Sequence, residues 1–135
     1  MTRHVIPKRV PRVLSVGQCG YDNHNISLFF KRTFGAHVEV ADTLDEALRA
    51  LREDSFALAL VNRVFDADGS MGLELIRAMK NEAEPKIAKT PVMLVSNYAD
   101  VRLQAEELGA LPGFGKAELI APRAELIARL KAVLD

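Results

Sequence analysis

Short aliphatic segments alternate along this chain with segments of helical period, and this alternation limits the fold more than any other feature. The aliphatic segments are residues 12–16, 37–40, 56–61 and 91–95, with a weaker one near Phe114. Between and after them, apolar residues recur three and four positions apart, which places their side chains on one face of a helix. Strict alternation of strands and helices is typical of a parallel sheet with right-handed crossovers and helices on both sides.

Five apolar stripes define the expected helices, and local signals mark some of the helix ends. The stripes lie within residues 26–34, 44–51, 73–79, 101–108 and 126–134. Thr43 and Glu46 match a capping box at the start of the second stripe. Gly109 follows the fourth stripe, where a glycine can end a helix in the left-handed conformation, and Pro122 suits the first turn of the last helix. Residues 81–89 are expected to form the longest loop.

The third aliphatic segment, residues 56–61, consists of apolar residues only. A strand of this kind is buried on both faces, as central strands of parallel sheets are. The whole pattern predicts a three-layer, doubly wound α/β fold of the flavodoxin-like type, with five helices and five parallel strands in the order 2-1-3-4-5. Helices one and five are expected on one face of the sheet, and helices two to four on the other. Residues 12–135 are predicted to form one domain, preceded by a tail of residues 1–11.

Charge and composition exclude several classes of function. Lys and Arg number 18, as do Asp and Glu, so the formal net charge is zero. This balance argues against binding to nucleic acid or to an anionic membrane. The locally basic start of the chain, with Arg3, Lys8, Arg9 and Arg12, is interpreted as a solvated tail. A single cysteine, Cys19, allows no internal disulfide, and no apolar run approaches the roughly 20 residues of a membrane span. We therefore expect a cytoplasmic protein.

The loops that follow the strands are the expected place for function. In open α/β sheets, ligands bind outside the carboxyl ends of the strands. Four loops lie there in this chain, at residues 17–24, 62–69, 96–98 and 116–117. Polar residues stand at or close to the expected strand ends in these loops: Gln18, Asn62, Ser96, Asn97 and an isolated lysine, Lys116.

These loops resemble the active site of the response-regulator receiver domain, the CheY-like family, over the chain from about Arg12 to its end. The family has an acidic pair after the first strand, a phosphoacceptor Asp ending the third, a Ser or Thr ending the fourth, and a Lys after the fifth. This chain has Val13-Leu-Ser-Val-Gly-Gln-Cys19, Leu60-Val-Asn62, Val95-Ser96 and Gly109-Ala-Leu-Pro-Gly-Phe-Gly-Lys116 in those places. The resemblance therefore assigns Gly17 and Gln18 to the acidic pair, Asn62 to the acceptor, Ser96 to the hydroxyl and Lys116 to the lysine.

The resemblance implies a degenerate receiver, or pseudo-receiver, because every carboxylate of the family's site is missing. An Asn62 amide is neutral and a poor nucleophile. Magnesium sites normally use at least one or two carboxylates, and Gly17 and Gln18 supply none. Phosphoryl transfer depends on positioning and on neutralising developing charge, so we expect no phosphoryl acceptance, no enzymatic activity, no metal and no cofactor. Two-component signalling through protein contacts, independent of phosphorylation, is the favoured function.

Several alternatives stay open in the same loops. Asp66 and Asp68 could form a displaced phosphoacceptor, although a turn that caps the next helix is the favoured interpretation. Cys19 and His24 could pair as a thiol and its base, but a small apolar role for the cysteine is favoured. The segment Gly17–Gly20 could turn backbone N–H groups toward an anion or a nucleotide near Lys116. Lys116 itself could pair with Asp22, Asp66 or Asp68, or extend to solvent.

The expected partners are proteins, with a histidine kinase or another signalling protein as candidates and a homodimer left open. In the family, the usual output surface is formed by helix four, strand five and helix five, and an aromatic residue of strand five helps to switch it. Gly113 occupies that aromatic position here, so we expect a surface held in one state. The residues expected to set its specificity through charge are Arg102, Glu106, Arg123 and Lys131.

Overall fold

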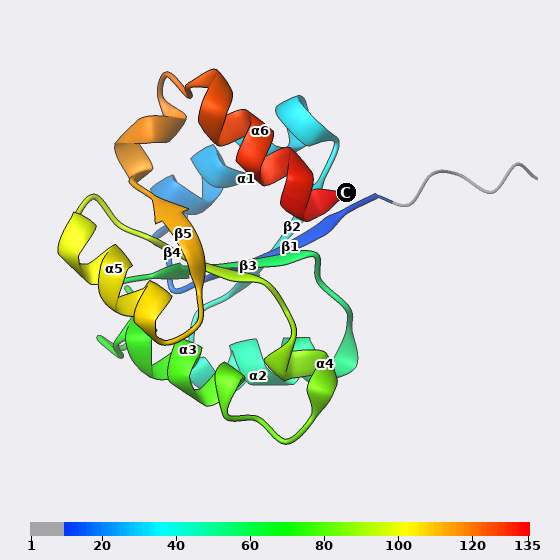
Figure 1. The fold of residues 1–135 in the computed structure, drawn as a ribbon, viewed down its shortest axis with the longest axis vertical. Coiled ribbons are helices and arrows are strands. Elements are labelled where there is room, and N and C mark those ends of the chain that lie inside the picture. Colours follow the sequence, from blue (N-terminus) through cyan, green and yellow to red (C-terminus); the bar gives the residue numbers. More distant parts are fainter. Residues whose placement is uncertain (1–9) are drawn as a thin grey trace, which may run out of the picture.

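The central element is a five-stranded sheet in which every pair of neighbouring strands is parallel. The computed structural model describes residues 10–135, so Arg3, Lys8 and Arg9 of the expected tail lie outside the described residues. The strands are β1 (Arg12–Val16), β2 (His37–Ala41), β3 (Leu58–Asn62), β4 (Val92–Val95) and β5 (Leu111–Phe114), in the order β2-β1-β3-β4-β5 (Figure 1). The predicted strand order and direction are confirmed.

The helices cover both faces of the sheet. They are α1 (Gly20–Phe34), α2 (Leu44–Glu53), α3 (Gly72–Lys80), α4 (Pro85–Ala88), α5 (Ala99–Glu107) and α6 (Ala124–Leu134), with a 3₁₀ turn, η1 (Lys116–Leu119), after β5. Helices α1 and α6 lie on one face and α2 to α5 on the other (Figure 1). The predicted division between the faces is confirmed.

The prediction of five helices is wrong by one short helix. Helix α4 occupies part of the stretch that was expected to be only a loop. Pro85 stands in its first turn, where a missing N–H costs nothing, and Ile87 is its single buried residue. One apolar residue among polar neighbours gives no stripe, so periodicity could not reveal this helix.

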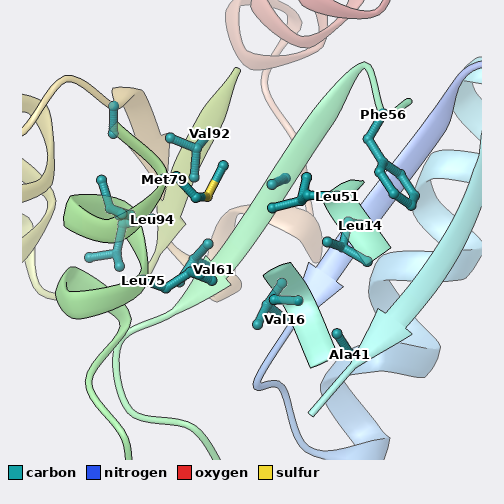
Figure 2. Packing of buried hydrophobic residues seen from close by; sticks show 14 of the residues in the cluster. Leu14, Val16, Ala41, Leu51, Phe56, Val61, Leu75, Met79, Val92 and Leu94 are labelled. Atoms are coloured by element: carbon teal, nitrogen blue, oxygen red, sulfur yellow. The ribbon is translucent and has the colours of Figure 1, made fainter. Parts of the chain in front are cut away.

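Two apolar clusters hold the three layers together. Side chains of β3 alternate between them, with Ala59 and Val61 on the α2–α5 side and Leu58 and Leu60 on the α1–α6 side. Figure 2 shows the first of these clusters, in which Val61 packs with Leu75 of α3. The central strand is therefore buried on both faces, as its uninterrupted apolar sequence predicted.

The helix ends follow the sequence signals with two differences. The Thr43 hydroxyl accepts the Glu46 N–H at 3.2 Å, but the Glu46 carboxylate accepts the N–H of Asp42, at 2.9 Å, rather than that of Thr43. Gly109 has a φ of 109° just after α5, as expected. Pro122 lies before the N-cap of α6 instead of in its first turn, because the helix begins at Ala124.

Strand β5 carries a β-bulge that accounts for its weak sequence signal. Met93 pairs with Leu111 and Val95 with Phe114, so one extra residue of β5 stands between the two pairs. A Cβ added at Gly113 would lie 2.0 Å from the carbonyl oxygen of Leu94. The bulge thus requires glycine at the position where the receiver family has its aromatic residue.

Restoring a side chain at this position should destabilise the fold. We expect Gly113→Ala to lower the free energy of unfolding by about 2–3 kcal/mol, because the backbone of β4 leaves no room for the methyl group. The matched control is Gly20→Ala in the first turn of α1, where an added Cβ meets nothing within 4 Å. That variant should be unchanged or stabilised by up to about 1 kcal/mol. Urea denaturation measures both, and equal stability of the two variants would contradict this account of the bulge.

Candidate functional site

The predicted site residues gather at the carboxyl edge of the sheet. Gly17 and Gln18 follow β1, Asn62 is the last residue of β3, Ser96 follows β4, and Lys116 begins η1. A cavity of about 380 Å³ opens at this edge, and three of the five predicted residues line it: Asn62, Ser96 and Lys116. Arg63 and Tyr98 line the same cavity, and the Arg63 guanidinium lies 4.9 Å from the centre of the Tyr98 ring.

Three hydrogen bonds to backbone atoms hold the Asn62 side chain. Its amide nitrogen donates to the carbonyl oxygen of Gly17 at 3.0 Å and to that of Val64 at 2.7 Å. Its amide oxygen accepts the N–H of Arg63 at 2.9 Å. An ionised carboxylate only accepts hydrogen bonds, so an aspartate could not make the first two contacts. Asn62 therefore ties the end of β1 to the loop that follows β3.

A phenylalanine fills the space beside Gly17. Gly17 has a φ of 76°, and a Cβ added there would lie 2.2 Å from the Phe65 ring. The ring is 1% exposed, and the loop that carries it is fixed because the Asp66 N–H donates to the Gly17 carbonyl at 2.9 Å. Sequence analysis missed Phe65, although one large apolar residue in a polar loop beside a glycine was an available signal.

The first loop is held by two other side chains. The Ser15 hydroxyl donates to the Asn23 amide oxygen at 2.8 Å, and the Asn23 amide nitrogen donates to the Gln18 carbonyl at 3.2 Å. The Gln18 side chain is 3% exposed, and neither polar atom of its amide has a hydrogen-bond partner among residues 10–135. Gln18 therefore places a buried neutral amide where the receiver family has an acidic residue.

Lys116 pairs with Asp22, one of the four arrangements left open by the sequence. Its ammonium lies 2.8 Å from the Asp22 carboxylate in the first turn of α1, and both side chains are partly buried. The ion pair joins η1 to α1. Lys116 is therefore directed to the acidic residue on α1 and not to Asp66 or Asp68.

Ser96 and Arg102 form a second set of local contacts. The buried Ser96 hydroxyl accepts the N–H of Tyr98 at 3.1 Å. The Arg102 guanidinium donates to the Ser96 carbonyl at 2.7 Å. This contact holds the Arg102 side chain against the end of β4, although the residue stays partly exposed, and its expected role in specificity stays a prediction.

Asp66 and Asp68 lie exposed at the tip of the loop after β3. The Asp68 carboxylate accepts the N–H of Ser70 at 2.9 Å, two residues on, as in an Asx turn. The expected cap of the next helix is wrong, because α3 has Met71 as its N-cap and no side-chain hydrogen bond there. Within residues 10–135, no group of three or more His, Cys, Asp or Glu side chains is placed to hold a metal ion.

Cys19 has a structural place in the fold. It is the N-cap of α1, and its sulfur accepts the N–H of Asp22 at 3.5 Å. His24 lies exposed on α1. None of the hydrogen bonds found in residues 10–135 joins the two side chains, so the structure does not bring together the thiol and base that the sequence left open.

Comparison with solved structures identifies the architecture. The chain is similar to the chemotaxis response regulator CheY4 of Vibrio cholerae, with a TM-score of 0.70, 18% identity, and coverage of 93% of this chain and 100% of the other. It is also similar to the BeF3-activated receiver domain of RstA from Klebsiella pneumoniae, with a TM-score of 0.72, 20% identity, and coverage of 91% and 97%. The chain has the receiver fold. No family model matches the sequence, and no curated protein matches it.

A third neighbour extends this likeness within the receiver fold. The receiver domain of a DNA-binding response regulator from Colwellia psychrerythraea has a TM-score of 0.74 at 17% identity, over 91% of this chain and 97% of the other. At such identities the likeness concerns the backbone, and the side chains of each site have to be considered one by one.

Within residues 10–135, no helix has the length and apolar character required to span a membrane.

The hydrogen bonds of Asn62 give a direct test of the site. Asn62→Asp should lower the free energy of unfolding at pH 7 by about 2–4 kcal/mol, because two donors are lost and a carboxylate then faces two carbonyl oxygens. The same surroundings raise the pKa of the new carboxyl in the folded state. Its protonation relieves the penalty, so the loss should shrink as the pH falls toward 4.

The control for this substitution is Asn25→Asp, which makes the same chemical change at an exposed position on α1. Thermal unfolding of both variants at pH 7 and pH 4 separates the local effect from the general response to acid. Equal stability of the two variants at pH 7 would show that the Asn62 amide contributes nothing to the fold.

Proposed function

We propose that this chain is a phosphorylation-independent receiver-like module that acts by binding other proteins. The observation that carries the proposal is that neutral groups stand at the positions of the family's carboxylates and are held there by contacts of their own. The Asn62 amide donates to Gly17 and Val64, and the Phe65 ring takes the space beside Gly17. These contacts join the loops after β1 and β3 and require neither a cation nor a phosphoryl group.

The chemistry of phosphoryl acceptance supports the same conclusion. The reaction needs a nucleophilic oxygen placed in line with the phosphorus and positive charge around the equatorial oxygens. The amide oxygen of Asn62 accepts a backbone N–H, and the Lys116 ammonium is neutralised by Asp22. Neither group is free for the role that the resemblance to receivers would give it.

The docking surface that we propose is the face made by α5, β5 and α6, hereafter the α5–β5–α6 face. Two large apolar side chains are exposed on it, Leu103 on α5 and Leu111 on β5. Arg123, the N-cap of α6, and Lys131 on α6 add positive charge at exposed positions, and Glu106 is partly exposed on α5. Apolar side chains would supply contact area, while the charges would select the partner. A histidine kinase or another signalling protein fits this proposal, as does a second copy of the chain.

Two features of β5 favour a face with a single conformation. Gly113 carries no side chain that could rotate, and the Arg129 guanidinium of α6 donates to the carbonyls of Pro112, at 2.8 Å, and Gly113, at 3.2 Å. A ligand shifts a conformational equilibrium only by its differential affinity for two states. With β5 bound to α6 in this way, we expect partners to recognise the face constitutively.

Two alternative functions, a displaced phosphoacceptor and an anion or nucleotide site, receive less support. Asp66 and Asp68 are exposed at the loop tip, and one carboxylate already holds the turn. Binding of an anion or nucleotide at the 380 Å³ cavity would have Arg63 and Lys116 as cations, but Lys116 is paired with Asp22. The displaced acceptor is an outcome that the following experiment can detect.

A small-molecule phosphodonor tests whether the chain accepts a phosphoryl group. After incubation with acetyl phosphate and Mg²⁺, the intact mass of the protein should be unchanged, because no carboxylate nucleophile stands beside a metal site. A receiver with the complete acidic pair and acceptor, treated in parallel, serves as the positive control. A stoichiometric phosphoryl adduct that disappears in Asp66→Asn or Asp68→Asn would overturn the proposal and assign the displaced acceptor.

Charge reversal tests the docking half. We expect Arg123→Glu with Lys131→Glu to abolish capture of the proteins that the wild type retains from native lysate, because repulsion replaces complementary charge. The control reverses Arg49 and Lys89, two exposed cations outside the face, and changes the net charge equally. Melting temperatures should differ by no more than a few degrees among the three proteins. Loss of capture in the control alone would place the docking surface elsewhere.

A further inference from the structure

A second concavity lies between α1 and the connection from β5 to α6. We call it the α1–η1 groove; its volume is about 680 Å³, and it is formed by one side of α1 together with η1 and the residues up to Pro122. The two walls are neighbours in space although they are far apart in sequence, with η1 in the orange segment of Figure 1. The apolar part of its lining includes Leu28, Phe29, Leu119, Ile120 and Pro122.

Size and lining give this groove the character of a small-molecule site. Such sites measure roughly 300–1,000 Å³ and are mostly apolar, with a few polar groups that fix orientation. Two large side chains of the lining remain in water, Tyr21 at 76% exposed and Ile120 at 86% exposed. A molecule held in the groove would cover apolar surface that the fold itself leaves uncovered.

The charges of the groove favour an anion. The cation Lys116 and the anion Asp22 both line it, and they neutralise each other. Arg32 lines it as well, and none of the ion pairs found in residues 10–135 involves this arginine. The lining therefore has one uncompensated positive charge, on a side chain whose planar guanidinium suits a carboxylate.

We propose that the α1–η1 groove binds a small amphiphilic carboxylate. Its aromatic or aliphatic body contacts Phe29, Leu119 and Ile120, and its carboxylate pairs with Arg32. Because η1 directly connects β5 to α6, the bound molecule contacts the segment that leads into the proposed docking face. The proposal does not depend on whether the chain accepts a phosphoryl group, and its test is separate from the tests given above.

Titration of the full chain with model ligands tests the groove. The probes are 3-phenylpropionate and octanoate, with the neutral 3-phenylpropionamide for comparison, and the readout is the ¹H–¹⁵N amide spectrum. Both carboxylates should give saturable shifts confined to α1 and residues 116–122. Affinity for the neutral amide should be weaker by about fivefold or more, because it cannot pair with the guanidinium.

Three variants distinguish the roles of charge and apolar surface. Arg32→Gln should weaken carboxylate binding about fivefold and leave binding of the neutral amide unchanged. Lys31→Gln removes a neighbouring cation that does not line the groove, so it should bind like the wild type. Ile120→Asp changes a side chain that hardly contacts the fold and should weaken binding of all three probes.

Either of two kinds of result would overturn the proposal. The first is equal affinity for 3-phenylpropionate and its amide, or no shift in the groove at concentrations up to the solubility of the probes. The second is a shift of the same amides that grows with protein concentration alone, which would show that a second copy of the chain occupies the groove.

Discussion

The pair of hydrogen bonds from the Asn62 amide to the carbonyls of Gly17 and Val64 determines how the carboxyl edge of the sheet is built. Just after β1 and β3, the carbonyls of Gly17 and Val64 approach the same point, and a positive or hydrogen-donating group has to lie between them. A metal ion can do so when acidic side chains hold it. Here one amide group does it, and each of its two N–H donors meets a carbonyl. The loop after β3 is thereby drawn over β1, which brings Phe65 against Gly17.

Neutral groups change the energetics of this edge. A cluster of carboxylates without a cation is destabilised by repulsion, and its members shift one another's pKa. Replacing the cluster by an amide and an aromatic ring removes that repulsion and adds buried apolar surface, which stabilises by about 25 cal/mol per Å². Gln18 is the exception, because its amide is buried without a partner among the described residues. The contacts by which the Asn62 amide and the Phe65 ring hold this edge require no ion.

Patterns of neighbouring residues predicted the fold well, because burial on one or both faces of a strand leaves a direct trace in the sequence. Contacts between distant loops leave no such trace. The three groups that Asn62 contacts are backbone atoms, and the types of the residues that carry them do not predict such hydrogen bonds. For the same reason the sequence offered three possible partners for Lys116, or exposure to solvent, and gave no ground for choosing among them. The contact of Arg102 with the Ser96 carbonyl was likewise not predicted, because charge patterns do not reveal contacts with backbone.

The edge strand β5 lies between the candidate site and the proposed docking face. It contacts α6 through Arg129, and it leads into η1, which carries Lys116. Its bulge exposes the carbonyls of Pro112 and Gly113 on the side of α6, and buried or partly buried carbonyls need donors. Arg129 supplies both donors from one guanidinium, so α6 is bound to the irregular part of the strand. Three residues after Gly113, at the start of the connection from β5 to α6, Lys116 binds η1 to α1 through Asp22. A molecule in the α1–η1 groove would contact this connection from Lys116 to Pro122, so its effect on the docking face would depend on how it alters the Lys116–Asp22 pair and the placement of α6.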